Sequence, residues 1–194
     1  MNIDGQTKNA IRFMLLLASF CSLVLLFTRA AIGERAELSL RSVDAILQIV
    51  GTEILPVEEQ LLGIFNTMFI KRSGGRVKFW QGSSRPDIWA CEATGNGMWA
   101  EITLVFVFDA SQRKLLGMRV VEQNETPGLG GQICEEVFYD QFEGLNASEG
   151  LKMATARVID NQFDAVTGAT ISSRAVETIM NKALQALRQL RSLS

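Results

Sequence analysis

An uncharged apolar run near the amino terminus constrains this chain more than any other feature of its sequence. Between Arg12 and Arg29 the residues FMLLLASFCSLVLLFT carry no charge, and small or apolar residues extend the run to residues 10–32. A helix needs roughly 20 apolar residues to cross a bilayer, and the stems of the two arginines can carry their charges to the interfaces. We therefore predict one transmembrane helix over residues 10–32, within an anchor segment of residues 1–33.

The same run has two other interpretations, a cleaved signal peptide and a buried core helix. Residues 28–30, with the sequence TRA, are a poor cleavage site because signal peptides end in small residues around one intervening position. Basic residues stand on both sides of the run: Lys8 and Arg12 before it, and Arg29, Arg35 and Arg41 after it. Positive charge marks the cytoplasmic side, so this distribution leaves the sidedness of the anchor open.

The composition excludes several classes of function. The 194 residues contain no histidine, so the commonest general base and the commonest zinc ligand are both absent. We predict no catalytic residue and no metal site. The net charge is -2 and no basic stripe is present, so nucleic acid is not expected as a partner. Cys91 and Cys134 lack CxxC spacing and are expected to be small buried side chains, although an oxidising compartment leaves a disulfide between them open.

Residues 34–75 read as a helical linker and packing region between the anchor and the main domain. Apolar residues from Glu34 to Val50 fall mostly on one helical face, which predicts an amphipathic helix. The apolar stretch Leu61–Ile70 fits either a helix or a strand, and residues 71–75, with the sequence KRSGG, are typical of a loop.

Residues 76–194 are predicted to form one α+β domain, an antiparallel sheet packed by helices. Four stretches have the composition of strands: Val77–Gln81, Ile88–Thr94, Met98–Phe108 and Lys114–Val121. Gly95-Asn96-Gly97 suggests a tight hairpin turn, and such short connections favour antiparallel pairing. Two later stretches have helical character, Gln132–Phe142 and Ile171–Leu190, and the second has apolar residues at intervals of three and four.

The first segment that could carry chemistry is ETPGLGG, residues 125–131, between the fourth strand and the next helix. Glycine lets backbone approach a ligand closely, and a helix that begins nearby offers free N–H groups. The alternative is a plain turn between a strand and a helix.

The second segment is DAVTGAT, residues 164–170, directly before the long carboxy-terminal helix. A helix amino terminus stabilises a phosphate through unpaired N–H groups and partial positive charge. Thr170 places a hydroxyl there, and Ser172 and Ser173 are expected to donate further hydrogen bonds. The alternative is that Thr167 or Thr170 only caps the helix, the usual role of a threonine in this place.

The run DAVTGATISSRAV resembles the flavinylation motif of the FMN-binding domains in the RnfG and NqrC subunits of ion-pumping redox complexes. ETPGLGG is similar to the flavin-contacting loop of that family and stands in the right order. The resemblance covers essentially the whole chain, with one membrane span at the amino terminus, and is specific from Glu122 onward.

This resemblance implies that Thr170 carries FMN through a covalent phosphoester, formed from FAD by a separate magnesium-dependent flavin transferase. It further implies that the transferase recognises four residues of the second segment: Asp164, Thr167, Gly168 and Ala169. The isoalloxazine ring is expected near six residues of the first segment: Glu125, Thr126, Pro127, Gly128, Leu129 and Gly130. It also implies a single-pass protein of the bacterial inner membrane, with a cytoplasmic tip and the flavin domain on the periplasmic side.

The function implied is an electron relay within a membrane complex, not turnover of a substrate by this chain alone. The RnfG type, which couples ferredoxin and NAD chemistry to ion movement, is favoured because the chain is short. The alternatives are an NqrC-type subunit of a sodium-translocating NADH:quinone reductase, a stand-alone membrane flavoprotein, and a membrane-anchored binding or assembly module without redox chemistry. The expected partners are other subunits of the complex, the flavin transferase and membrane lipid.

Overall fold

The computed structural model describes residues 5–32, 38–51, 58–73, 77–154 and 159–192. The chain divides into two compact units, Met1–Glu37 and Leu38–Ser194. The first unit contains helix α1, Gly5–Ile32. Within it, Thr7–Leu26 is long and apolar enough to cross a membrane, a test that a signal sequence near the amino terminus also passes. The helix predicted over residues 10–32 is therefore present, and residues 1–4 and 33 of the predicted anchor segment lie outside the described residues.

The second unit opens with helix α2, Leu40–Ile49, helix α3, Glu58–Met68, and strand β1, Phe69–Ser73. Ser39 caps α2 by accepting a hydrogen bond from the Ser42 N–H at 3.1 Å. The amphipathic helix predicted over residues 34–50 is confirmed for 40–49, whereas Leu38 and Ser39 precede it and residues 34–37 lie outside the described residues. The stretch Leu61–Ile70, which fits either a helix or a strand by its sequence, contains both, because α3 ends at Met68 and β1 begins at the next residue.

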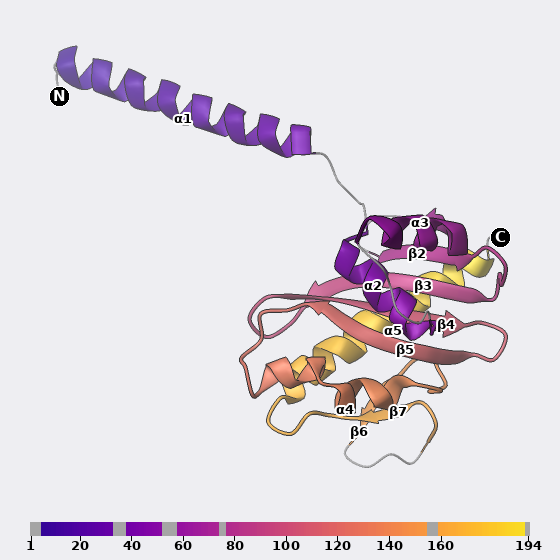
Figure 1. The fold of residues 1–194 in the computed structure, drawn as a ribbon. Helices are drawn as coiled ribbons and strands as arrows, with labels where there is room; N and C mark the ends of the chain where they lie inside the picture. The colour runs from indigo at the N-terminus through magenta and orange to yellow at the C-terminus, as the bar shows by residue number, and fades with distance from the viewer. Residues whose placement is uncertain (1–4, 33–37, 52–57, 74–76, 155–158, 193–194) are drawn as a thin grey trace. The chain divides into compact units, whose positions relative to one another are not determined.

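A five-stranded sheet forms the centre of this unit (Figure 1). Its strands pair antiparallel in chain order, β1 to β5. The other four strands are β2, Val77–Gly82; β3, Ile88–Asn96; β4, Glu101–Asp109; and β5, Lys114–Glu122. The predicted antiparallel α+β architecture is confirmed, and the four predicted strands are present with small shifts at their ends.

The turn predicted at Gly95-Asn96-Gly97 is wrong, and so is the start of the following strand at Met98. Strand β3 continues through Asn96, and the Gly97 N–H donates to the Ala100 carbonyl at 2.7 Å, so residues 97–100 form the turn. Gly95 serves packing instead. A Cβ at this position would lie 2.6 Å from Cγ1 of Ile179 in the carboxy-terminal helix, so glycine lets that helix approach the sheet.

We expect G95A to destabilise the domain by about 1–3 kcal/mol, because the added methyl forces Ile179 and its helix away from the sheet. Urea unfolding of the purified protein measures the loss. The matched control is G63A on the exposed side of α3, where a Cβ meets nothing within 4 Å. That variant should be neutral or more stable by up to about 1 kcal/mol, since alanine favours helix. Equal stabilities for the two variants would contradict the packing role of Gly95.

After β5 the chain forms short pieces and then one long helix. These are the 3-10 helix η1, Gly130–Cys134; helix α4, Glu136–Tyr139; the 3-10 helix η2, Asp140–Phe142; the parallel strands β6, Lys152–Ala154, and β7, Gln162–Asp164; and helix α5, Thr170–Ser192. The single helix predicted over Gln132–Phe142 is wrong because Glu135, at φ -84° and ψ 146°, interrupts it with an extended backbone. The helix predicted over Ile171–Leu190 is confirmed.

Helices cover both faces of the sheet, so the unit has two cores. Phe106 and Leu104 of β4 face α5, whereas Val105 and Val107 face α2 and α3. Figure 1 shows α5 in yellow on one side of the sheet and α2 in violet on the other. Burial on both faces explains why β4 is apolar along nearly its whole length. The sheet therefore fixes α5 and the loop that leads into it.

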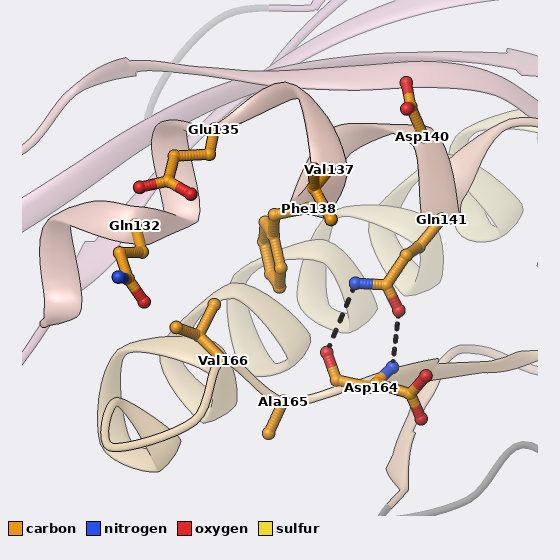
Figure 2. A pocket seen from close by; sticks show the side chains of 9 residues that line it. All are labelled: Gln132, Glu135, Val137, Phe138, Asp140, Gln141, Asp164, Ala165 and Val166. Carbon is orange, nitrogen blue, oxygen red and sulfur yellow. Dashed lines mark hydrogen bonds between the residues drawn. The ribbon is translucent and has the colours of Figure 1, made fainter. Parts of the chain in front are cut away.

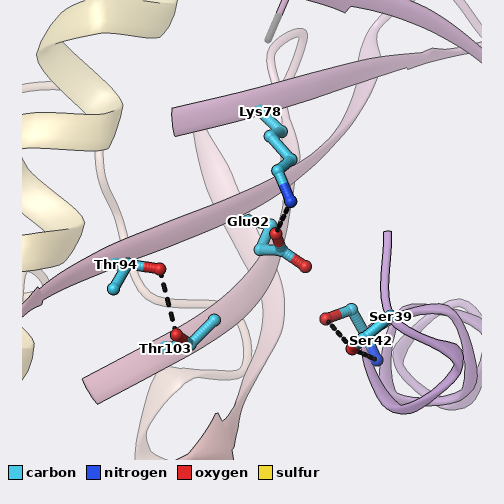
Figure 3. A network of polar contacts seen from close by, with 6 residues as sticks. All are labelled: Ser39, Ser42, Lys78, Glu92, Thr94 and Thr103. Atoms are coloured by element: carbon cyan, nitrogen blue, oxygen red, sulfur yellow. Dashed lines mark hydrogen bonds and ion pairs between the residues drawn. The ribbon is translucent and has the colours of Figure 1, made fainter. Parts of the chain in front are cut away.

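Polar contacts also lie on the α2 side of the sheet (Figure 3). The Lys78 ammonium donates to the Glu92 carboxylate at 2.6 Å, and the Thr94 and Thr103 hydroxyls lie 3.0 Å apart. Glu92 is 6% exposed, which makes it a buried carboxylate with a paired charge.

The cysteines are free thiols, so the disulfide left open between Cys91 and Cys134 does not form in this structure. Burial raises the pKa of both thiols, most strongly at fully buried Cys91. Because the thiolate is the reactive form, we expect Cys91 to resist maleimide at neutral pH until the domain is unfolded in urea. Labelling of Cys91 in the folded protein, located by peptide mass mapping, would contradict its burial.

Candidate functional site

The loop after β5 is organised around a buried carboxylate. Glu125 is 5% exposed, and its Oε1 accepts hydrogen bonds from the backbone N–H groups of Met98 at 2.8 Å and Trp99 at 3.2 Å. Its Oε2 accepts from the Ser172 hydroxyl at 2.5 Å. Glu125 thus joins three segments: the β3–β4 turn, the glycine-rich loop and the first turn of α5. The predicted contact between Glu125 and a ligand is not favoured, because the side chain points inward.

Thr170 is exposed at the amino terminus of α5. The Ala169 carbonyl accepts the first helical hydrogen bond, from the Ser173 N–H at 3.0 Å. Thr170 is therefore the first residue inside the helix and Ala169 is its cap, so neither Thr167 nor Thr170 caps α5. Backbone N–H groups in a first turn have no acceptor within their own helix. Thr170, which is exposed, thus lies beside these N–H donors at the positive end of the helix dipole.

The two sequence segments lie against each other at this point. A Cβ on Gly168, whose φ is +78°, would lie 3.4 Å from Cδ2 of Leu129. A Cβ on Gly130 would lie 2.6 Å from the Ser172 hydroxyl and 2.8 Å from Oε2 of Glu125. The fold therefore brings ETPGLGG and the TGAT end of DAVTGAT into one surface. Thr126, Pro127, Gly128, Leu129, Thr167, Gly168 and Thr170 are exposed on it, while Gly130 and Ala169 are buried beneath it.

The serines after Thr170 do not have the predicted role. Ser172 and Ser173 are both buried. The Ser172 hydroxyl donates to Glu125, and the Ser173 hydroxyl donates to the Ala169 carbonyl at 3.1 Å while accepting from the Val166 N–H at 3.0 Å. Their hydrogen bonds fix the helix start from inside, so they are not available to a phosphate at the surface.

The β3–β4 turn is also part of the site, although the sequence did not indicate it. Met98 and Trp99 are 50% and 68% exposed, although their backbone N–H groups are held by Glu125. Leu129 and Ile171 are also exposed, at 49% and 57%, next to the same network. Exposed apolar side chains around one polar network indicate a place where a flat apolar ligand could rest. An exposed tryptophan in a turn was the available signal, but no local pattern tied it to residues 125–131.

Asp164 belongs to a neighbouring cavity and not to the exposed surface (Figure 2). The cavity has a volume of about 530 Å³ and is lined by Gln132, Glu135, Val137, Phe138, Asp140, Gln141, Asp164, Ala165 and Val166. The Asp164 N–H donates to Oε1 of Gln141 at 2.7 Å, and Nε2 of Gln141 donates back to the Asp164 carbonyl at 3.4 Å. This pair of bonds fixes the point at which β7 enters the motif.

Comparison with known families identifies the domain. Residues 97–185 match the model of the FMN-binding domain family. This chain contains an FMN-binding domain. The match begins at the β3–β4 turn and includes both segments of the site, so the FMN-binding domain contains every residue singled out from the sequence as a cofactor contact.

Relatives of this chain are subunits of oxidoreductase complexes. The chain is 37% identical over 78 residues to the G subunit of the Na(+)-translocating ferredoxin:NAD(+) oxidoreductase complex of Acetobacterium woodii, a match that covers 39% of this chain and 37% of that protein. It is 29% identical over 126 residues to the G subunit of the ion-translocating oxidoreductase complex of Haemophilus influenzae, covering 63% of this chain and 56% of that protein. The matches therefore span about half the length of these relatives or less.

A solved structure shares the fold. The C subunit of the Na(+)-translocating NADH-quinone reductase of Parabacteroides distasonis aligns with a TM-score of 0.59 at 19% identity, covering 79% of this chain and 98% of that one. The sheet and helices of the aligned part of this chain are thus arranged as in that reductase component.

The surface residues of the FMN-binding domain fit this cofactor. Thr170 and the first turn of α5 offer a hydroxyl and N–H donors, which suit a phosphate. Gly128, at φ +72°, has nothing within 4 Å of where a Cβ would stand, so the loop leaves open space above the backbone. The exposed apolar side chains of Trp99, Leu129 and Ile171 suit a flat ring system.

Proposed function

We propose that this chain is a membrane-anchored electron-transfer subunit that carries FMN as a phosphoester on Thr170. The observation that carries the proposal is the position of Thr170, whose hydroxyl is exposed in the first turn of α5 against the glycine-rich loop. A bound flavin supplies the redox chemistry, and the protein supplies position and electrostatics.

Each part of the surface has a role in holding the cofactor. The N–H groups of the first turn of α5 and the dipole of that long helix stabilise the phosphate. Gly168 and Ala169 keep the backbone free of bulky side chains next to Thr170, and the glycine-rich loop approaches Gly168 through Leu129. Met98 and Trp99 are added to this set as contacts from the β3–β4 turn.

Attachment requires a flavin transferase and FAD as the donor. The Thr170 Oγ forms a bond to the phosphorus of the FMN portion, the bond from that phosphorus to the AMP portion breaks, and AMP leaves. The hydroxyl proton passes to a base of the transferase. Asp164, Thr167, Gly168 and Ala169 are the residues that this enzyme reads, and only Ala169 among them is buried.

The cellular setting is inferred from the anchor and the relatives. Thr7–Leu26 is long and apolar enough to hold the chain in a bacterial inner membrane, with the FMN-binding domain on the periplasmic side. The similarity to G subunits favours an Rnf-type ferredoxin:NAD complex, with other subunits as electron partners. Co-purification of the tagged chain with multispanning subunits from its native membrane tests this setting, and isolation of the chain alone under mild detergent would contradict it.

The attachment is tested by denaturation. Co-expressed with a flavin transferase, the protein should keep yellow colour and flavin fluorescence through boiling in detergent and gel electrophoresis. Loss of all flavin on denaturation would show that the cofactor is bound without a covalent bond and would overturn the ester.

A further inference from the structure

We propose that Glu125 is a positioning residue that also lowers the reduction potential of the flavin, an inference that rests on the proposed function. Glu125 stands within the glycine-rich loop, yet it is only 5% exposed and both of its carboxylate oxygens accept hydrogen bonds. Its effect on a bound cofactor therefore comes through charge and through the segments that it holds, not through contact.

Two glycines fit the fold around this carboxylate. A Cβ on Gly97 would overlap Oε1, and a Cβ on Gly130 would lie 2.8 Å from Oε2 and 2.9 Å from the Cβ of Glu125. The two glycines come from different segments, the β3–β4 turn and the loop after β5. Gly97 and Gly130 thus leave space for the carboxylate on two sides. Through Glu125, the turn that contains Trp99 and the loop that contains Leu129 are held in place together.

The side-chain oxygens of Glu125 act as acceptors in three hydrogen bonds. Met98 N–H, Trp99 N–H and the Ser172 hydroxyl all donate to it. None of these three donors is a cationic side chain, so the carboxylate keeps its negative charge in a buried place. The positive end of the α5 dipole offsets part of that charge.

A fixed negative charge disfavours the addition of an electron to a nearby group. In a partly buried environment, a unit charge within roughly 10 Å changes such an equilibrium by about tenfold. Ser172, which Glu125 holds, is in the same helical turn as Thr170. The carboxylate therefore makes a flavin on Thr170 harder to reduce than it would be over a neutral residue.

The test is E125Q in the full chain loaded with flavin by a transferase. The Gln amide oxygen can still accept from Met98 and Trp99, and its NH2 group can donate to Ser172, so geometry is kept while the charge is removed. We expect the mass to show flavin loading equal to wild type. The ratio of reduced to oxidised flavin at a fixed ambient potential should rise about tenfold, a shift of about 59 mV to more positive potential for a one-electron couple.

The matched control is E92Q, which removes the charge of another buried carboxylate. Glu92 is 6% exposed and lies on the α2 side of the sheet, about 13 Å along β3 from Asn96. Its partner Lys78 stays charged in E92Q, so this variant changes the net charge by the same amount as E125Q but farther from the site. The flavin potential of E92Q should equal that of wild type. An unchanged potential in E125Q, or the same shift in E92Q, would overturn the charge effect.

The positioning role has a readout that needs no flavin. In the protein expressed without a transferase, hydrogen exchange at the Met98 and Trp99 amides should be slow in wild type and in E125Q but fast in E125A, which lacks the acceptor. Fast exchange in wild type would overturn the positioning role. A failure of the proposed function would instead leave these amides protected while the transferase adds no flavin to the wild-type chain.

Discussion

T170V should abolish covalent flavinylation while leaving the domain folded. Valine has nearly the shape of threonine but no hydroxyl, so the ester has no oxygen from which to form. Thr170 is exposed at the start of α5 and lies outside both cores, so the free energy of unfolding should change by less than about 0.5 kcal/mol. In-gel fluorescence after co-expression with a flavin transferase should fall from full signal to background.

Two further variants make this result specific. T170S keeps a hydroxyl at the same atom and should retain attachment, at a rate that depends on how the transferase accepts serine. T178V removes another exposed threonine of α5, whose hydroxyl donates to the Arg174 carbonyl at 2.8 Å, and should be flavinylated as wild type. Fluorescence retained in T170V, or lost equally in T178V, would contradict the assignment of the ester to Thr170.

The second large effect is expected from G130A. A methyl group at this buried position would lie 2.6 Å from the Ser172 hydroxyl and 2.8 Å from the Glu125 carboxylate. The loop must then move away from α5, which breaks the bond between Glu125 and Ser172 or displaces the β3–β4 turn. We expect about 1–3 kcal/mol of destabilisation and a loss of most flavin loading, because the loop that packs against the first turn of α5 shifts.

The adjacent glycine provides a close control for G130A. A Cβ on Gly131 would lie 3.3 Å from the Thr126 carbonyl, a contact that small movements can relieve. G131A should therefore lose clearly less stability in urea unfolding and keep more of its flavin by absorbance. If G131A and G130A behave alike, the close packing of Gly130 against Glu125 is not what holds the site together.

Local patterns were sufficient for most of the fold. The apolar composition and length of β2–β5 and the intervals of three and four in α5 are set by burial against neighbouring layers, so they are visible in the sequence. The sequence also marked Thr170 and the glycine-rich loop, since a hydroxyl and small residues before a long helix suit a phosphate.

Features that depend on contacts between distant segments could not be predicted in this way. Gly95 looks like a turn residue but lies in β3 and makes room for Ile179, and Gly97, which begins the turn, also makes room for Glu125. The sequence of 132–142 has helical composition, but Glu135 is extended and divides it. Trp99 joins the site because its backbone N–H donates to the carboxylate of Glu125, 26 residues later in the chain. No periodic pattern in the sequence predicts such a contact.

The Glu125 side chain points inward, and this is the largest difference between the site in the structure and the site predicted from the sequence. Its neighbours Thr126–Leu129 are exposed, so exposure along the loop gives no sign that one carboxylate turns into the core. Three donors from two other segments account for that direction, because a buried carboxylate is stable only where hydrogen bonds replace water.

The covalent bond at Thr170 is best sought by tandem mass spectrometry of the protein from its native membrane. We expect a single modified peptide that contains DAVTGATISSR, with the mass of FMN added as an ester and the fragment ions placing it on Thr170. An unmodified Thr170 in protein from cells with an active flavin transferase, or FMN on another residue, would contradict it.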